Sequence, residues 1–489
     1  MVISTIGMYI PPAKTRTFKL PNQPGSTTGG IQEAIDAAAA AGGGTVEIPA
    51  GTFVLHTPSG HPALLLKSQV TLLGSGQEKT ILKLAGQSNK SLAFLANASY
   101  ANPDSAKPDH DIVLRNLSID VNGSEQVVRE TRLDRSIPAA GEQEVKLESS
   151  EGVAEDSVLV IDAGPKEEVV PVMSARSGSL RAQVMRAHAK GTRVLQILDR
   201  LHALVLIGAD GVVLEDVTIR NVPKDGIYLS STLDGVHHSN YCHRITIQRC
   251  NFTSCHRNAI SVIDADDVTI ASNQFNDITG DPGSPVDIEP DYPEQHGDRI
   301  VIRDNTATRC SRGVSLSLQL GGATSANFRG ESVTGNKIVG TLYGPGILVL
   351  KQQAGAKIVA NTIDTPATDG IVVVGSSNIE VRQNTIVSPG RCRATGNCNQ
   401  GAVGVGIRLL DATDGKGTVA LNRSKVTQNT IEDTQSPATL LYGVDFSSKG
   451  TANVITDNVV SGFDRQRGSA IHAQRELGSN TIQTTARAK

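Results

Sequence analysis

This chain of 489 residues has few aromatic side chains: they make up 3% of the sequence, and tryptophan is absent. The core must therefore be built from Val, Ile, Leu and Ala. No stretch reaches the roughly 20 apolar residues that a membrane-spanning helix needs, and no long basic or acidic run accompanies the net charge of −3. These absences argue against a membrane or a nucleic acid as partner.

Six cysteines are too few for a disulfide scaffold. Cys392 and Cys398 flank a polar loop and are placed to form one disulfide, whereas the other four lie in separate segments and are expected to be small buried residues. The N-terminal stretch "MVISTIGMYIPPAKTRTFKL" lacks the basic, apolar and small-residue layout of a secretory signal. We expect either an intracellular protein or a secreted one whose signal has been removed.

From about residue 205 onward, a pattern of two short strands recurs. The second strand of each repeat alternates aliphatic and other residues, as in "DGIYLSS" and "DGIVVVG", which predicts a strand with one buried face. A period of about 20–30 residues without helices predicts a solenoid of parallel-paired coils. The segment before each second strand carries an Asn, expected on one line of turns because Asn tolerates the left-handed conformation. These are Asn251, Asn273, Asn305, Asn336, Asn361, Asn384, Asn429, Asn458 and Asn480.

The N-terminal part predicts a cap, and a later segment interrupts the repeats. "GGIQEAIDAAAAAGGG" predicts an amphipathic helix with Ile31, Ala34 and Ile35 on one face, as the open end of a solenoid requires. Residues 123–200 lack the Asn-centred repeats and predict longer strands joined by Gly, Asp and Ser turns. We expect three parts: 1–122, the cap and first coils; 123–200, a small inserted β module bordering one end of a cleft; and 201–489, the main solenoid with the site.

Aligning the second strands at their small residue predicts one row of outward side chains. The row holds Tyr228, Ser261, Asp287, Ser315, Leu348, Val372, Arg408, Asp445 and His472. Leu348 and Val372, with Leu350 and Val374 two residues further along their strands, are apolar, and we expect a loop (320–345 or 391–405) or another subunit to cover them.

The stretch "SPVDIEPDY" brings three carboxylates onto one coil. Asp287 and Glu289 are two residues apart on the strand, so their Cα atoms lie roughly 6.6 Å apart. Two carboxyls this close raise one pKa, as a general acid requires. We expect both to be catalytic and to face solvent on the floor of a cleft, with Asp264 at the end of the preceding strand as the next candidate. The alternative is a solvated strand face whose acids discourage aggregation.

Other polar residues at the strand entrances or on the same face are candidates for binding sugar hydroxyls or a carboxylate. They are Asp225, Tyr228, His256, Arg257, Asp291, Arg312, Lys351 and Arg408. No metal or other cofactor is expected, although the cluster of Asp287, Glu289 and Asp291 offers the oxygen ligands that Ca²⁺ takes.

The segment "GGIQEAIDAAAAAGGGTVEIPAGTFVL" followed by Asn-centred coils resembles the right-handed parallel β-helix, or pectin-lyase-like, superfamily. The resemblance covers most of the chain outside 123–200 and implies an all-β, elongated, carbohydrate-active protein with its site on one exposed sheet. Its tailspike and fructotransferase members imply a homotrimer. Subfamily motifs do not match: only Asp225 falls where a polygalacturonase has an equivalent acid, the alginate epimerase signature is absent, and Gln319 stands where an alginate lyase would place Arg.

These observations predict an enzyme that cleaves glycosidic bonds of a poly- or oligosaccharide, by hydrolysis or intramolecular glycosyl transfer, because carboxylates are abundant and a base-plus-arginine pair is not evident. A polysaccharide lyase or epimerase on the same fold is the first alternative. A non-catalytic, tailspike-like glycan-binding protein is the second, and the scarcity of aromatic platforms for sugar rings disfavours it.

Overall fold

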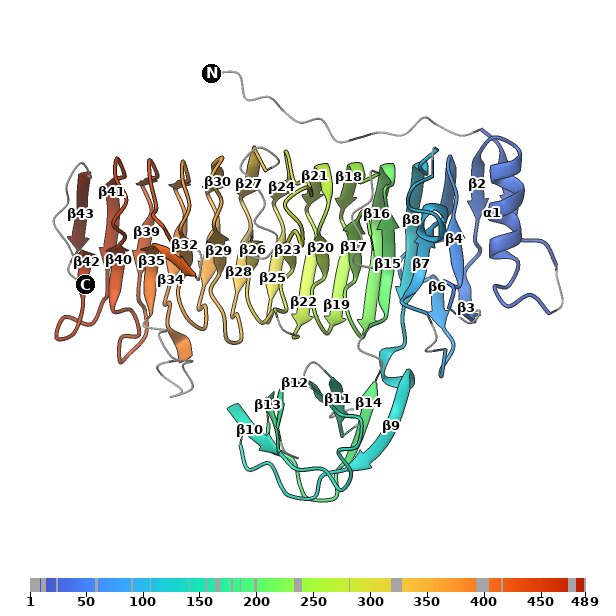
Figure 1. Cartoon of the computed structure of the whole chain (residues 1–489), viewed down its shortest axis with the longest axis horizontal. Coiled ribbons are helices and arrows are strands. Elements are labelled where there is room, and N and C mark those ends of the chain that lie inside the picture. Colours follow the sequence, from blue (N-terminus) through green and yellow to red (C-terminus); the bar gives the residue numbers. More distant parts are fainter. Residues whose placement is uncertain are drawn as a thin grey trace.

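The structure is a computed structural model in which the chain winds into a parallel β-helix (Figure 1). It describes residues 9, 15–22, 25–57, 60–88, 91–105, 107–139, 141–154, 157–162, 168–176, 179–184, 186–197, 200–232, 240–280, 282–317, 328–392, 404–414, 417–473 and 481–487. In this part of the chain, no helix has the length and apolar character to cross a membrane.

One side of the solenoid is a twelve-stranded sheet in which every pairing is parallel. Its strands in order are β4 (Leu64–Leu66), β7 (Ala93–Asn97), β15 (His202–Ile207), β17 (Ile227–Ser230), β20 (Ile260–Val262), β23 (Val286–Ile288), β26 (Val314–Ser317), β29 (Ile347–Leu350), β32 (Ile371–Val374), β35 (Val405–Leu410), β40 (Tyr442–Ser447) and β42 (Ser469–Ala473).

The remaining coil strands form a 23-stranded sheet made of two rows that share four strands. The shared strands are β8 (His110–Asp120), β16 (Asp210–Val222), β41 (Val454–Ser461) and β43 (Thr481–Arg487). The first row adds β1 (Thr17–Lys19), β2 (Gly44–Glu47), β5 (Val70–Leu73), β18 (Cys242–Gln248), β21 (Ala265–Ala271), β24 (Val301–Arg303), β27 (Glu331–Thr334), β30 (Ala356–Val359), β33 (Glu380–Arg382) and β38 (Lys425–Thr427). The second row adds β3 (Gly51–Leu55), β6 (Thr80–Leu84), β19 (Asn251–Cys255), β22 (Gln274–Ile278), β25 (Thr306–Thr308), β28 (Lys337–Val339), β31 (Thr362–Asp364), β34 (Thr385–Val387) and β39 (Thr430–Glu432).

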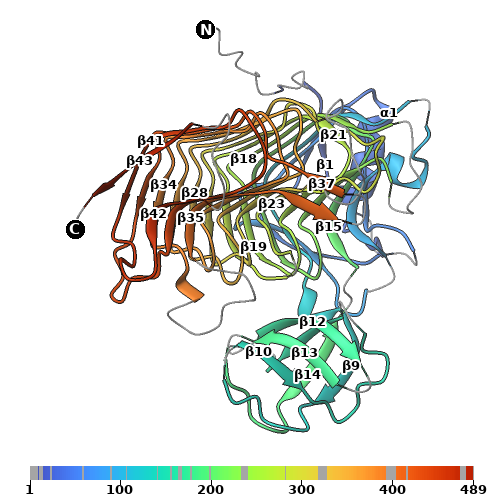
Figure 2. The same ribbon diagram turned by 60° about the vertical axis from the view of Figure 1, so that its left-hand side comes forward.

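The two ends and the middle of the chain add elements outside the coils. Helix α1 (Ile31–Ala40) covers the first coil and buries Ile31, Ala34 and Ile35, as predicted. After β8 and the 3₁₀ turn η2 (Gly123–Glu125), the chain leaves the solenoid and forms a six-stranded antiparallel sheet with its own apolar core (Figure 2). Its strands are β9 (Val127–Arg132), β10 (Gly141–Val145), β11 (Val158–Ile161), β12 (Glu168–Arg176), β13 (Ser179–Val184) and β14 (Arg193–Ile197), and a small hairpin, β36 (Ala412–Asp414) with β37 (Gly417–Val419), lies near the C-terminal coils.

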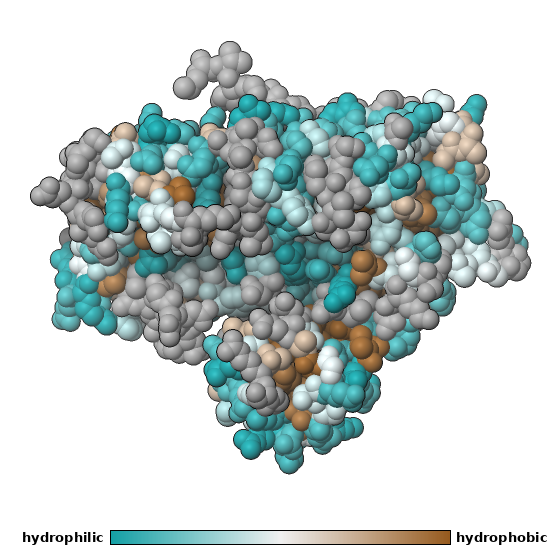
Figure 3. Space-filling view, in the orientation of Figure 1, coloured by the Kyte–Doolittle hydropathy of each residue, from teal (hydrophilic) through white to brown (hydrophobic). Residues whose placement is uncertain are grey.

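The predicted fold class is therefore confirmed: all-β, a parallel β-helix with a capping helix and a small inserted β module. Most of the face in Figure 3 is hydrophilic, and hydrophobic side chains gather on the module and beside it. Cys242, Cys250, Cys255 and Cys310 are buried free thiols. Cys392 is disulfide-bonded, and its predicted partner Cys398 lies outside the described residues.

A ladder of Asn side chains runs along one line of turns through seven coils. Each except the last donates its amide to the Asn of the next coil, as Asn361 Nδ2 does to Asn384 Oδ1 at 3.0 Å. The members are Asn273, Asn305, Asn336, Asn361, Asn384, Asn429 and Asn458. Asn251 was predicted to belong but does not, because the ladder position of its coil is Cys250, whose N–H donates to Asn273 Oδ1 at 2.8 Å; Asn480 is outside the described residues.

Candidate active site

The strand register sets the outward row of the twelve-stranded sheet. Consecutive Cα partners are Val205, Tyr228, Ser261, Asp287, Ser315, Leu348, Val372, Arg408, Asp445 and His472. The row that we predicted from the sequence is therefore confirmed from Tyr228 to His472. The row is apolar at Val205 and polar from Ser261 to Ser315. It is apolar again at Leu348 and Val372, and charged at its far end. The coil that carries Asp287, Glu289 and Asp291 is called the acid coil below.

The side chains of Asp287 and Glu289 are not solvent-facing, contrary to our expectation. Asp287 is only 2% exposed, and the side chain of Glu289 is 13% exposed. The reason is that side chains of the preceding coil lie over β23. Arg257 and Asn258, at the entrance to β20, both bond to Glu289 and close the space above the strand.

Arg257 is the centre of the site. Its Nη1 lies 3.0 Å from Oδ2 of Asp225, and its Nη2 lies 2.6 Å from Oε1 of Glu289. Oε1 of Glu289 also accepts a hydrogen bond from Asn258 Nδ2 at 3.1 Å and one from Ser261 Oγ at 3.4 Å. Three neighbouring coils therefore hold one guanidinium group and two carboxylates in a fixed arrangement.

Asp225 is fully buried, which by itself raises its pKa, but Arg257 together with His202 and Lys224 holds that pKa well below its usual range. Asp225 is therefore a permanent anion that anchors Arg257. His202 Nδ1 lies 3.3 Å from Asp225 Oδ2, and burial lowers the pKa of His202.

Asp287 and Glu289 form a coupled pair. Burial raises the pKa of both carboxyls, and the charge of Asp287 raises the pKa of Glu289 further. Ser315, Arg257 and Arg312 act in the opposite direction on Asp287. Oδ1 of Asp287 is buried with no hydrogen-bond partner among the described residues, whereas Glu289 Oε1 accepts from several donors. The pair therefore holds one proton more readily than two isolated carboxyls would: the pKa of Glu289 is raised more than that of Asp287, whereas the ion pair with Arg257 favours the ionised form of Glu289.

Tyr228 and Asp291 border this pair. The Tyr228 ring lies 4.9 Å from the His202 ring, and burial, followed by the charges of Asp291 and Asp225, raises the pKa of the Tyr228 hydroxyl. Asp291 is exposed, and Gln295 binds its backbone N–H. The site thus has a buried floor and a solvent-exposed rim.

His256 and Arg312 are the other predicted binding residues near this coil. Burial lowers the pKa of His256 to about 4, so its imidazole is neutral at physiological pH. Arg312 precedes β26, and its charge lowers the pKa of Asp287. Both are half-buried.

Asp264, the third predicted catalytic carboxylate, is fully buried and bound to His296. Its Oδ1 accepts the His296 N–H at 2.8 Å and lies 3.0 Å from His296 Nδ1. The His296 ring in turn stacks on Tyr241 with a centroid distance of 3.8 Å. Asp264 therefore fixes the loop that follows Glu289 and Asp291.

Arg408 belongs to a second polar cluster, on β35 and its neighbours. Its Nη1 lies 3.0 Å from Asp369 Oδ2, and its Nε lies 3.5 Å from Asp445 Oδ2. Asp445 Oδ1 lies 2.9 Å from His472 Nδ1. Lys351 directly follows β29 and has a half-buried side chain and a left-handed backbone, φ 57°. The structure therefore separates Arg408 and Lys351 from the acid coil, although all lie along one sheet.

Sequence reasoning missed His202 and Asn258. Asn258 lies beside Arg257 in the stretch "HRNAISV", at the entrance to β20, so the prediction for Arg257 was the available signal. His202 comes from the coil before Asp225, directly after the inserted module, and the repeat pattern gave no signal for it.

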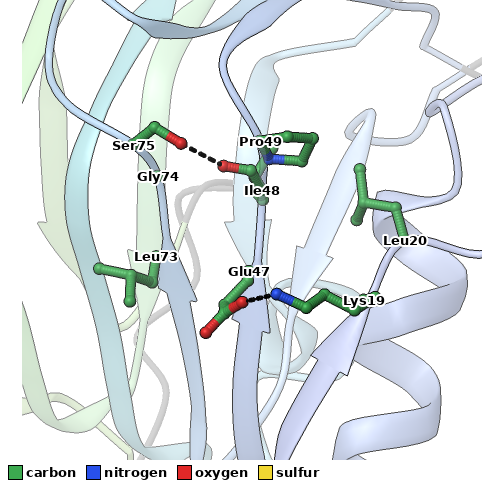
Figure 4. A pocket seen from close by; sticks show the side chains of 8 residues that line it. All are labelled: Lys19, Leu20, Glu47, Ile48, Pro49, Leu73, Gly74 and Ser75. Carbon is green, nitrogen blue, oxygen red and sulfur yellow. Dashed lines mark hydrogen bonds and ion pairs between the residues drawn. The ribbon is translucent and has the colours of Figure 1, made fainter.

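The described residues contain no group of three or more His, Cys, Asp or Glu side chains arranged to hold a metal ion. Asp287, Glu289 and Asp291 are among the described residues and do not form such a group; the absence of a metal stays a prediction. A separate pocket of about 430 Å³ lies on the first coils, where Lys19 pairs with Glu47 and Ser75 donates to Ile48 O (Figure 4). None of the candidate site residues lines it.

Known proteins resemble this chain in two ways: a few are similar in sequence over short stretches, and more are similar in fold over nearly its whole length. A stretch of 87 residues is 40% identical to mannuronan C5-epimerase AlgE3 of Azotobacter vinelandii, and 98 residues are 36% identical to alginate lyase 7 of the same organism. These stretches cover 17% and 19% of this chain, but only 5% and 11% of the relatives' own length.

Solved structures resemble nearly the whole chain at low identity. The A-module of mannuronan C-5 epimerase AlgE6 of Azotobacter vinelandii aligns over 94% of both chains, with a TM-score of 0.59 and 16% identity. The family 28 exopolygalacturonase of Yersinia enterocolitica aligns over 98% of this chain and 78% of its own, with a TM-score of 0.53 and 13% identity. The tailspike protein of E. coli bacteriophage HK620 aligns over 95% of this chain and 69% of its own, with a TM-score of 0.52 and 13% identity.

The family model described as "right handed beta helix region" matches residues 195–345, 234–422 and 345–485, together more than half of the chain. This chain therefore belongs to the right-handed parallel β-helix family.

Proposed function

We propose that this protein is a carbohydrate-active enzyme that cleaves glycosidic bonds in a poly- or oligosaccharide, by hydrolysis or intramolecular glycosyl transfer. The observation that carries the proposal is the pair of Asp287 and Glu289. One carboxyl has a buried oxygen without a partner among the described residues, and the other is bound to Arg257. A pair of carboxyls with different environments supplies the acid and the base of glycoside cleavage.

In the proposed reaction, Asp287 donates its proton to the leaving glycosidic oxygen. Glu289 acts from the ionised state, either as the nucleophile of a retaining reaction or as the base that activates water in an inverting one. Arg257 keeps Glu289 charged, and Asp225 holds Arg257 in place. Asp264 supports the rim through His296 and is not assigned a proton-transfer step.

The similarity to a mannuronan C5-epimerase and an alginate lyase favours one second candidate, β-elimination or C5 epimerisation of a uronate. In that chemistry an Arg would neutralise the substrate carboxylate. Arg257 is already bound to two carboxylates of the protein, Asp225 and Glu289, and this arrangement favours glycoside cleavage.

The test is incubation with a panel of mannuronan, polygalacturonate and neutral polysaccharides. We expect new reducing ends, or cyclised products of transfer, without the ultraviolet absorbance of unsaturated uronates. Absorbance in that band would establish elimination instead, and a change in uronate configuration without cleavage would establish epimerisation. Glycan binding without any product would make the protein a non-catalytic binder. We propose that no metal takes part, so a chelator should leave the rate unchanged.

The oligomeric state is also a proposal: a homotrimer. Its support is the resemblance to tailspike members of the superfamily, which implied a trimer, together with the similar fold of the bacteriophage HK620 tailspike protein. Leu348, Val372, Leu350 and Val374 are half-buried within one chain, and the subunit contact is not assigned to them. Light scattering coupled to size exclusion should give three times the chain mass of 51.4 kDa, and a monomer mass would contradict the trimer.

A further inference from the structure

The outward row of the twelve-stranded sheet is blocked on the N-terminal side of the acid coil. Ala96 and Val205, the row positions of β7 and β15, are 0% exposed although they point away from the solenoid core. They form an apolar cluster of their own with Ala93 and Ile207, and Leu65, Tyr100 and Tyr228 pack against it. Hydrophobic packing, not solvent, therefore occupies the outer face there.

A segment fixed by hydrogen bonds forms this cover. After β7 the chain turns through η1 (Ala98–Ala101), which carries Tyr100. Asp109 Oδ2 accepts from the Ser99 hydroxyl at 2.8 Å and from Asn97 Nδ2 at 2.9 Å, and Asn97 Nδ2 also donates to Ile207 O at 2.8 Å. Asn240 Nδ2 ties the far end of the segment through Pro103 O at 2.8 Å. These bonds make the cover a rigid wall.

Tyr228 is the last residue of the wall and the first of the site. It packs on the apolar cluster, and its register partner on the other side is Ser261, which contacts Glu289. The wall therefore ends two coils before Asp287, which is about 10 Å at the usual strand spacing. A sugar bound over Asp287 has room for only a short piece of its chain in this direction.

On the C-terminal side of the acid coil, the outward row is partly open to solvent. Beyond Ser315, the row positions Leu348, Val372 and Arg408 are partly exposed. From β23 to β35 is four coils, or about 19 Å at the usual strand spacing. This length, with apolar side chains first and the charged cluster of Arg408 at its far end, suits several sugar units of a glycan.

We propose that the site is a dead end that takes the terminus of a glycan chain, with the rest of the chain lying over the C-terminal coils. This inference rests on the proposed glycosidase function and adds its mode of action. The enzyme removes a short fragment of fixed length from one chain end and does not cut within long chains.

The test uses the wild-type protein and whichever polysaccharide of the panel it cleaves, with the reducing ends fluorescently labelled. We expect one short product length from the first turnovers and a slow loss of viscosity per bond cleaved. The position of the label tells which chain end enters. A rapid loss of viscosity with products of many lengths would overturn the dead end while leaving the proposed function intact. No cleavage of any glycan in the panel would overturn both.

A variant pair tests the wall itself. Tyr100→Ala removes the covering ring, whereas Tyr100→Phe keeps the ring and removes only the hydroxyl. We expect Tyr100→Ala to yield products of more than one length and Tyr100→Phe to keep the wild-type pattern. Identical patterns from folded Tyr100→Ala and wild type would show that Tyr100 does not close the site; if Tyr100→Ala does not fold, the wild-type product lengths alone decide.

Discussion

Replacing one member of the Asn ladder should destabilise the protein strongly, and Asn361→Ala is the clearest case. Asn361 is 1% exposed. Its Oδ1 accepts from the Asn336 N–H at 2.9 Å and from Asn336 Nδ2 at 3.0 Å, while its Nδ2 donates to Val333 O at 2.8 Å and to Asn384 Oδ1 at 3.0 Å. Alanine removes all four bonds and leaves their partners buried.

Each buried hydrogen bond contributes about 0.5–1.5 kcal/mol, and a partner left unsatisfied costs about 1–3 kcal/mol. Allowing for partners that find new bonds, we expect a loss of roughly 3–6 kcal/mol in the free energy of unfolding. Urea denaturation followed by circular dichroism measures it.

Asn251→Ala is the matched control because Asn251 looks like a ladder residue in the sequence but makes one side-chain contact, to Gln77 Oε1 at 3.1 Å. We expect it to lose no more than about 1 kcal/mol. Equal losses from Asn361→Ala and Asn251→Ala would refute the ladder as a major source of stability.

Three further predictions concern single charged residues. Glu331 is 2% exposed, and burial raises its pKa to about 8. The stability of the wild type should therefore fall as pH rises from about 4.5 to 8, and Glu331→Gln should abolish most of that fall in melting curves recorded at several pH values. The same pH dependence in wild type and variant would contradict this. Arg257→Met strips the buried Asp225 of its cation and should destabilise by about 3–5 kcal/mol in urea, whereas an unchanged midpoint would show that Asp225 needs no counter-ion. Arg408→Ala should raise KM for long glycans more than for short ones. The control is Arg382→Ala, because Arg382 forms an ion pair with Glu380 on the other sheet. An equal change in KM for all glycan lengths would show that Arg408 is not part of the extended site.

Much of the fold was predictable because a period-two pattern and a repeat leave few arrangements open. The small residue at the start of each second strand fixed the register, so the outward row from Tyr228 to His472 came out correctly. The ladder prediction was wrong at Asn251 because the repeats were aligned by their Asn residues. Aligning Phe252 with Phe275, which are register partners, puts Cys250 opposite Asn273.

The environment of the site was less predictable because it depends on contacts between coils. Alternation showed that Asp287 points away from the core, but not that Arg257 and Asn258 of the preceding coil cover its strand. His202 reaches Asp225 only because the chain returns from the inserted module beside it. Such contacts depend on side-chain length and turn geometry, neither of which a repeat pattern encodes.

The most direct test of the account is turnover by Asp287→Asn and Glu289→Gln on a confirmed substrate. Each should slow turnover by about 10²–10⁴ or more, while Asp364→Asn on the opposite sheet should keep the wild-type rate. Asp287→Asn should also fold normally, because in the proposed mechanism the neutral amide replaces a carboxyl that carries the proton of the pair. If both folded variants keep near-wild-type rates, Asp287 and Glu289 are not the catalytic pair and the proposed mechanism is wrong.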